Sequence, residues 1–232
     1  MERMLLSRIR LRPTAAQDPQ FWRRSRNDPL GHHTVWSLFE GEPKNGRPFL
    51  YRQEAGGTQA AFFILSRRAP IDSVGLWDIE SKELAPVLEP GQQLSFTLRA
   101  SPTIRRGRRK EDGSDERGFV GKRMDVVMDA KRQARAREED VDTSELVQSA
   151  SRSWLASKGE RGGFQLAEEA FRAEGYRQHR VPRRGQPPAT FSTVDLSGVL
   201  RVVDVERFLA TIGSGIGPEK AFGCGLLLIR RA

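Results

Sequence analysis

Apolar and polar residues alternate in several short segments of the chain, which is the pattern of half-buried β-strands. In the second half of residues 3–12, Ile9 and Leu11 alternate with three arginines, Arg8, Arg10 and Arg12. Similar patterns predict strands at residues 49–53, 60–67 and 93–100. The first part of the chain therefore contributes several strands that each bury one face.

A helix is predicted to follow the first strand. Asp28 and Pro29 are typical of an N-cap and a first helical position. Apolar residues then recur at helical spacing, at Val35, Trp36 and Phe39. We therefore expect a helix that begins at Pro29 and carries two adjacent histidines just beyond its first turn.

The second half of the chain predicts a regular alternation of elements. Helical patterns cover residues 124–139 and 143–156, and residues 164–204 predict two long strands that flank a basic, proline-containing turn. A helix over residues 205–213 leads through a glycine-rich loop into a last apolar strand. The order strand, helix, strand, strand, helix, strand is that of a ferredoxin-like unit.

The first half is a less regular version of the same series, so the predicted fold class is α+β, with two tandem ferredoxin-like (RAMP or RRM-like) domains. Residues 85–92 carry two prolines and a glycine and are predicted to join the domains. We place an N-terminal domain at residues 1–88. Residues 89–232 form a C-terminal domain with a basic hairpin and the glycine-rich loop.

Composition narrows the class of protein. The chain has 232 residues, 37% of them hydrophobic, with no transmembrane run and no signal-peptide pattern at its first residues. Its single cysteine, Cys224, excludes an internal disulfide framework and an ordinary zinc cage, and its glycine neighbours favour a small packing residue. These features predict a cytoplasmic protein.

Net charge points to a polyanionic partner. The formal charge is +9, and seven of the 39 lysines and arginines are lysine, which leaves 32 arginines. Positive charge alone fits a nucleic acid or an anionic membrane surface. Because guanidinium groups pair with phosphate and stack on bases, the arginine excess favours a nucleic acid. A high-GC genome also raises arginine content, which reduces the weight of this signal.

Four motifs occur in the order found in a known family. They are HHTVWSLF at 32–39, LRASPTIR at 98–105, GVLRVVD at 198–204 and GSGIGPEKAFGCGLLLI at 213–229. Together they resemble the CasE family, the CRISPR repeat-processing endoribonucleases of the type I-E Cascade complex. The likeness spans the chain from Met1 to Arg230, and the C-terminal glycine-rich motif is its most specific part.

The resemblance implies tandem ferredoxin-like folds that bind the stem-loop of a CRISPR repeat RNA and cleave precursor CRISPR RNA at the 3′ base of the stem. It implies an enzyme of antiviral defence that needs no metal or cofactor. After cleavage the protein stays on the 3′ hairpin of the guide RNA as a Cascade subunit. Its partners would then be this RNA, other Cascade subunits and, only indirectly, target DNA, with no membrane.

Metal-free cleavage of RNA uses the ribose 2′-OH as nucleophile and needs a group that accepts its proton, for which histidine is best suited near neutral pH. The chain has three histidines, and His179 lies in the basic turn, which leaves His32 and His33. Spacing alone leaves catalysis and core packing equally open for His32. The resemblance places the catalytic histidine at His32, with His33 second.

Two departures from the family pattern leave the second catalytic group open. Pro29 stands where family members often carry tyrosine, and Ser37 stands where they often carry a basic residue. Catalysis then rests on His32 alone, or a partner comes from elsewhere, with Lys220 and His33 as candidates. The departures also support a different hypothesis, a catalytically inactive RNA-binding subunit of the same complex.

Three segments are candidates for RNA binding. The basic turn contributes Arg177, Arg180, Arg183 and Arg184, with a solvated charged turn as the alternative. The loop at 104–123 contributes Arg105, Arg106, Arg108 and Arg109, with a solvated loop as the alternative because acidic residues interrupt it. The glycine-rich loop, expected beside the His32 helix, would turn backbone amides and one cation toward the RNA through Gly215, Gly217 and Lys220, with a flexible turn before the last strand as the alternative. Basic residues at 131–137 are interpreted as a solvated helix face.

Overall fold

The computed structural model describes residues 3–17, 19, 21, 31–39, 48–54, 60–105, 123–167, 170–183 and 185–232, apart from the side chains of residues 183 and 186. Its first half contains β1 (Leu5–Leu11), α1 (Pro13–Ala16), α3 (His32–Trp36), the 3-10 helix η1 (Ser37–Phe39), β2 (Phe49–Gln53), β3 (Ala61–Ser66) and β4 (Trp77–Glu83). Its second half contains β5 (Gln93–Ala100), β6 (Thr103–Arg105), β7 (Arg123–Asp125), α4 (Val126–Ala136), α5 (Thr143–Gly162), β8 (Phe164–Leu166), β9 (Arg172–Arg183), β10 (Gln186–Val202), α6 (Val205–Ser214), η3 (Lys220–Phe222) and β11 (Leu227–Arg231).

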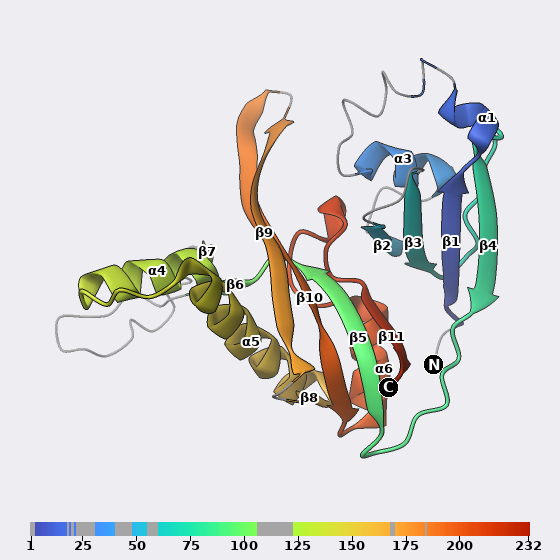
Figure 1. The fold of residues 1–232 in the computed structure, drawn as a ribbon. Coiled ribbons are helices and arrows are strands. Elements are labelled where there is room, and N and C mark those ends of the chain that lie inside the picture. Colours follow the sequence, from blue (N-terminus) through green and yellow to red (C-terminus); the bar gives the residue numbers. More distant parts are fainter. Residues whose placement is uncertain are drawn as a thin grey trace.

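The first sheet has four antiparallel strands in the order β2-β3-β1-β4. The alternation predicted within residues 3–12 is present, because Ile9 and Leu11 are fully buried on one face of β1. The segment of α3 and η1 covers that face through Val35, Leu38 and Phe39, which belong to the same core cluster. Figure 1 shows this helical segment lying across the sheet.

The second sheet has the strand order β11-β5-β10-β8, and β9 pairs with β10 outside that path. Helices α5 and α6 cover one face through Trp154, Leu155, Phe208 and Ile212, which share a core with the inward residues of β5 and β10. β5 pairs with β10 only from Val194 onward, whereas β9 pairs with the earlier part of β10. The β9–β10 ribbon therefore projects beyond the sheet (Figure 1).

Both sheets have the ferredoxin-like strand order. Numbering the four strands β1–β4 in chain order gives 2-3-1-4 in the first sheet, and numbering the four strands β5, β8, β10 and β11 in the same way gives the reverse order, 4-1-3-2, in the second. The prediction of an α+β protein with two tandem ferredoxin-like folds is therefore confirmed. The first half departs from the ideal unit because residues 67–76, which are all described, form a loop where the second helix would lie.

The two sheets share packing at their junction. In β2, Phe49 and Tyr51 point into the first core, whereas Leu50 between them belongs to the second core. Leu65 of β3 also joins the second core. A strand buried on both faces lies between two layers, so β2 and β3 lie between the α3 layer and the second sheet.

Several predicted elements differ at their ends. The helix predicted at 143–156 continues to Gly162 and ends where Gly163 adopts a φ of 77°. The helix predicted from residue 124 begins at Val126, because the Asp125 carboxylate caps it by accepting from the amides of Val127 and Met128. The segment predicted as two long strands contains a third, β8, which pairs with the end of β10.

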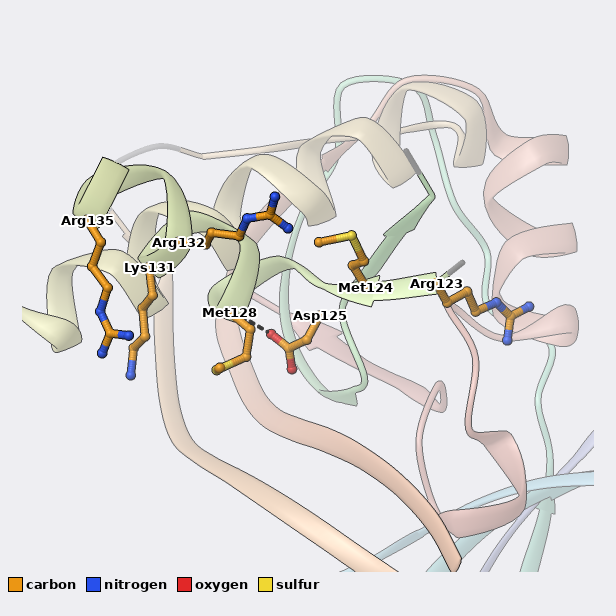
Figure 2. Close-up of a pocket in the computed structure, with 7 residues that line it drawn as sticks. All are labelled: Arg123, Met124, Asp125, Met128, Lys131, Arg132 and Arg135. Carbon is orange, nitrogen blue, oxygen red and sulfur yellow. Dashed lines mark hydrogen bonds between the residues drawn. The ribbon is translucent and has the colours of Figure 1, made fainter. Parts of the chain in front are cut away.

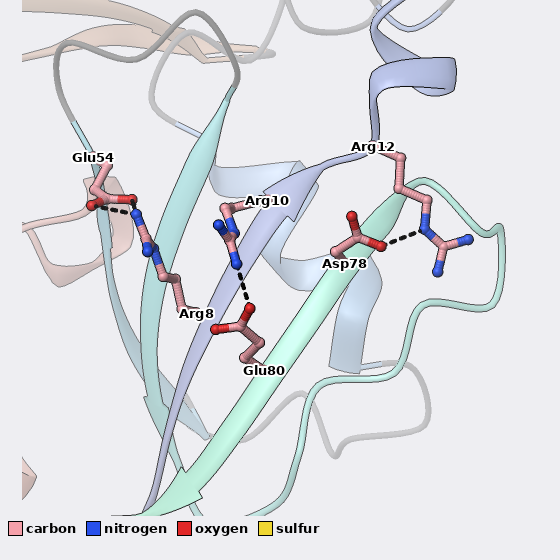
Figure 3. A network of polar contacts seen from close by, with 6 residues as sticks. All are labelled: Arg8, Arg10, Arg12, Glu54, Asp78 and Glu80. Carbon is pink, nitrogen blue, oxygen red and sulfur yellow. Dashed lines mark hydrogen bonds and ion pairs between the residues drawn. The ribbon is translucent and has the colours of Figure 1, made fainter.

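The alternating arginines of β1 form a neutralised row. Arg8 pairs with Glu54, Arg10 with Glu80 and Arg12 with Asp78, as Figure 3 shows. Arg8 and Arg10 lie opposite the buried face of β1, and Arg12 directly follows its last residue. Each is beside a carboxylate from the loop after β2 or from β4. These three cations therefore contribute little to a surface for a polyanion.

Candidate active site

His32 is the first residue of α3, and a close backbone contact places it there. Gly31 precedes it with a φ of 70°, and a Cβ at Gly31 would lie 2.3 Å from Cε1 of Phe62. Only glycine permits both the left-handed conformation and this approach. The prediction that this helix begins at Pro29 is thus wrong, because α3 begins at His32. Asp28 and Pro29 themselves lie outside the described residues. At five residues, α3 supplies few aligned dipoles to the imidazole.

The His32 imidazole is held by a backbone carbonyl from the other end of the chain. Nδ1 of His32 lies 2.8 Å from the carbonyl oxygen of Ala221, in η3. Because a carbonyl oxygen can only accept, Nδ1 carries the hydrogen, and in the neutral ring Nε2 keeps its lone pair. The hydroxyl of the fully buried Tyr51 donates to the same oxygen at 2.8 Å. One carbonyl thus joins α3, β2 and the glycine-rich loop.

His33 has a different setting. Its side chain is exposed, and its ring meets that of His32 edge to face, with centroids 5.1 Å apart. Trp36 also packs its ring against His32, at 6.4 Å. His32 therefore combines ring packing with an anchored Nδ1, and such an anchor is one of the things that a positioned general base requires.

The glycine-rich loop lies beside α3, as expected, but its glycines have packing roles. A Cβ at Gly215 would lie 2.8 Å from Cδ1 of Leu50, and one at Gly217 would lie 3.0 Å from the Trp154 ring. The backbone amide of Gly215 donates to the carbonyl oxygen of Thr211, and the backbone amide of Gly225 donates to the carbonyl oxygen of Arg99. The Gly215 amide is therefore already used within the protein and is not available to a phosphate, and RNA contact by Gly217 stays a prediction.

Lys220 belongs to a group of neighbouring cations that was not predicted from the sequence. Burial lowers the pKa of Lys158, and the neighbouring charges of Arg161, Lys220 and Arg123 lower it further. Lys158 Nζ also lies 5.7 Å from the ring centroid of Trp154, which packs against the glycine-rich loop. The predicted helix ended at residue 156, so its last turn, with Lys158 and Arg161, was missed.

Arg105 extends this group of cations. It lies on β6, is exposed, and pairs in register with Arg123 of β7. The other candidates of this loop, Arg106, Arg108 and Arg109, lie outside the described residues. The described part of the loop therefore places Arg105 and Arg123 near the end of α5, and contact of the remaining arginines with RNA stays a prediction.

The basic turn is the tip of the projecting β9–β10 ribbon. Arg177 and Arg180 are exposed on β9, opposite Thr193 and Thr190 of β10. The side chain of Arg183 and all of Arg184 lie outside the described residues. His179, predicted in the turn, lies on β9 with Nε2 2.8 Å from Oγ1 of Thr193, and burial, with the Arg177 and Arg99 charges, lowers its pKa.

A pocket of about 570 Å³ lies along α4 (Figure 2). Four cations and two methionines line it together with one carboxylate: Arg123, Met124, Asp125, Met128, Lys131, Arg132 and Arg135. The Asp125 carboxylate accepts from two helix amides and from the Tyr176 hydroxyl, so its charge is shared among donors. The helix face interpreted as merely solvated thus borders a cationic hollow.

Cys224 packs inside the second half, as predicted. It is fully buried, and burial raises the pKa of its thiol to about 12. Within the described ranges no group of three or more histidine, cysteine, aspartate or glutamate residues gathers in a metal-binding arrangement. Nor does any helix among those residues have the length and apolar character needed to cross a membrane.

Fold and site together define a class: an α+β protein of two ferredoxin-like sheets, with a carbonyl-anchored histidine at their junction and a basic ribbon beside it. The model of the CRISPR associated protein family matches residues 4–231. The chain therefore belongs to this family, and the predicted resemblance to its CasE members is confirmed.

Individual relatives agree with this assignment. The chain is 26% identical to the CRISPR system Cascade subunit CasE of Escherichia coli K12 over 84% of its own length and 88% of that protein. It is 31% identical to the CRISPR-associated endoribonuclease Cse3 of Thermus thermophilus over 64% of its length and 60% of that protein. A structure of Thermus thermophilus Cse3 bound to an RNA representing a pre-cleavage complex matches with a TM-score of 0.69 and 27% identity, covering 98% of this chain and 99% of that one.

Proposed function

We propose that this chain is a metal-independent endoribonuclease that binds the stem-loop of a CRISPR repeat and cleaves precursor CRISPR RNA at the 3′ base of the stem. The observation that carries the proposal is the His32 imidazole, anchored through Nδ1 to Ala221 beside the projecting basic ribbon. Relatives named as an endoribonuclease and as a Cascade subunit support the same activity.

The chemistry follows from the anchored ring. Nε2 of His32 takes the proton of the 2′-OH, whose oxygen attacks the neighbouring phosphorus in line with the departing 5′-oxygen. The products are a 2′,3′-cyclic phosphate and a 5′-OH. Lys220 lies in the same 3-10 turn as the anchoring carbonyl, so its ammonium group can stabilise the charge that develops on the phosphate. Lys220 and His33 remain the candidates for protonating the leaving oxygen.

The β9–β10 ribbon is the proposed RNA grip. A two-stranded ribbon exposes side chains on both faces, and Arg177 and Arg180 stand on the part that leaves the sheet. Sequence-specific contact with A-form RNA is restricted by its deep, narrow major groove, which a thin projecting element can enter more readily than a helix face. The cations around Lys158 and along α4 would hold the flanking phosphates.

Replacing both Arg177 and Arg180 with alanine is expected to weaken repeat-hairpin binding by about 10- to 100-fold, because two phosphate contacts are lost. The slope of log Kd against log salt concentration should flatten by about one unit for each arginine. Fluorescence anisotropy at several salt concentrations measures both quantities. A matched control replaces Arg10 and Arg12, which are paired with Glu80 and Asp78, and should leave the slope unchanged. A wild-type slope in the Arg177 and Arg180 variant would reject the gripping role.

The product is expected to stay bound, since the surface that grips the stem is not altered by cleavage at its base. The protein would then remain on the 3′ hairpin of the guide RNA as a subunit of Cascade, in the cytoplasm, where the precursor transcript is made. We also propose a division of labour between residues 1–88, which carry His32, and residues 89–232, which carry the ribbon and the glycine-rich loop.

Incubation with end-labelled repeat RNA in the presence of EDTA tests this function. One cut with a 2′,3′-cyclic phosphate end is the expected result. Tight binding with no cut, with or without added Mg²⁺, would instead establish the alternative of an inactive RNA-binding subunit. Equal affinity for the repeat hairpin and for an unrelated hairpin would reject both.

A further inference from the structure

Four aromatic rings form a continuous row between the basic ribbon and the candidate catalytic histidine. His179 stacks on Phe191 with centroids 5.2 Å apart and planes 23° apart, and Phe191 stacks on Phe222 at 4.8 Å and 20°. Phe222 in turn lies 6.0 Å from the His32 ring, tilted by 37°. We call His179, Phe191, Phe222 and His32 the aromatic row. All four side chains are half-buried, so the row lies at the surface rather than inside a core.

The first ring beside His32 comes from the turn that also anchors it. Phe222 directly follows Ala221, whose carbonyl accepts from Nδ1 of His32. A hydrogen bond to a carbonyl oxygen accepts a broad range of directions, so this bond locates Nδ1 without fixing the ring plane. The ring of Phe222 restricts that plane together with the rings of His33 and Trp36. Because Phe222 directly follows Ala221, a shift of Phe222 would also move the Ala221 carbonyl.

The far end of the row belongs to the proposed RNA grip. His179 and Phe191 are cross-strand partners on β9 and β10, and His179 is held by its contact with Thr193. Figure 1 shows the C-terminal segment, in red, reaching between this ribbon and α3. The base of the ribbon therefore packs against Phe222 through Phe191, and Phe222 packs against His32.

We propose that Phe222 is a positioning residue that sets the direction in which Nε2 of His32 points. Phe191 and His179 support the Phe222 ring from the side of the ribbon, so that binding of the ribbon to RNA aligns the histidine. This inference rests on the proposed endoribonuclease function. Its physical basis is that proton transfer and in-line attack tolerate little displacement, so that a shift near 1 Å costs roughly 100-fold in rate.

Phe222→Leu removes the flat ring but keeps an apolar side chain. The expected result is a fall of about 10- to 100-fold in the single-turnover rate at saturating repeat RNA, with Kd within about twofold of wild type. Phe222→Tyr restores a ring and should recover the rate to within about threefold. Phe191→Leu, one ring further away, should fall between these two variants.

A matched control separates positioning from general loss of an aromatic ring. Phe164 packs edge to face on Phe208 in the second core, away from the row. Phe164→Leu should therefore lower the unfolding midpoint without lowering the rate of the folded protein. A Phe222→Leu rate equal to that of wild type would overturn the inference while leaving the endoribonuclease function intact.

A second measurement does not depend on cleavage. The ¹⁵N chemical shifts of His32 report which ring nitrogen carries the hydrogen, and the wild-type ring should be held mainly in its Nδ1–H form. In Phe222→Leu the two forms should mix, and Phe222→Tyr should restore the single form. If wild-type protein fails to cut the repeat, the proposed function fails, and unchanged His32 shifts in Phe222→Leu would then also reject the positioning role.

Discussion

Replacing His32 with alanine is expected to slow cleavage of the repeat RNA by about 10²- to 10⁴-fold at neutral pH, the range that a positioned general base supplies. Affinity for the RNA should change by less than about twofold, because the imidazole is half-buried and tied to the Ala221 carbonyl rather than exposed as a cationic contact. Single-turnover kinetics with excess enzyme, together with anisotropy binding curves, separate the two effects.

The adjacent histidine provides the matched control. His33 is exposed, and its ring meets that of His32 edge to face, so His33→Ala should keep the rate within about tenfold of wild type. A larger loss would assign His33 the protonation of the leaving oxygen. Full loss in His33→Ala with normal cleavage by His32→Ala would mean that the catalytic position is one residue later than proposed.

Local patterns were sufficient for most of the strands and for the fold class. The alternation within residues 3–12 identified β1 because one face of that strand is buried and the other is charged. The start of α3 could not be found in this way. It depends on the contact between Gly31 and the Phe62 ring, which joins residues from separate strands and loops and leaves no local pattern.

The chemistry of the site was only partly predictable. His32 could be selected because histidines are few and the motif around it resembles a known family. The carbonyl that anchors His32 could not be predicted, since every residue has a backbone carbonyl and that of Ala221 is not marked by any residue type. Glycines at 215 and 217 suggested an anion-binding loop. A Cβ at either position would meet Leu50 or the Trp154 ring, a packing reason for glycine that the sequence does not reveal, and RNA contact by Gly217 stays a prediction.

The net charge of the protein follows from the sequence, but the positions of the paired and clustered cations do not. Arg8, Arg10 and Arg12 are neutralised by carboxylates, whereas the pKa of Lys158 is lowered partly by the charges of neighbouring cations. Sequence spacing reveals neither fact, because the paired carboxylates and the clustered cations come from distant segments. Among the described residues, the exposed arginines proposed for RNA contact, Arg105, Arg177 and Arg180, all lie in the second half.

Replacing Asp195 with alanine is expected to destabilise the protein by about 2–4 kcal/mol, the largest single-site loss of stability that we predict. The Asp195 carboxylate of β10 accepts from Arg99 at 2.9 and 2.7 Å and from Arg52 at 3.4 Å. The side chains of Arg52 and Arg99 are only 17% and 21% exposed, so the substitution would leave two poorly hydrated cations without their carboxylate.

The directions of the two arginine pKa values agree with this expectation. Burial lowers the pKa of Arg52, with the Asp195 charge opposing it, whereas the hydrogen bonds that Arg99 donates to Asp195 raise the pKa of Arg99. Arg52 lies on β2 of the first sheet and Arg99 on β5 of the second. The carboxylate therefore links the two halves as well as stabilising each cation.

Urea unfolding of wild type, Asp195→Ala and Asp195→Asn measures the loss, with Asp195→Asn separating the charge from the shape of the side chain. Asp78→Ala is the matched control, because its ion pair with Arg12 is largely exposed and should contribute less than about 1 kcal/mol. A loss below about 1 kcal/mol in Asp195→Ala would show that the two guanidinium groups find water or other partners. In that case the Asp195 ion pairs would not stabilise the junction between the first and second sheets. The junction would then depend on the packing of Leu50 and Leu65 into the second core.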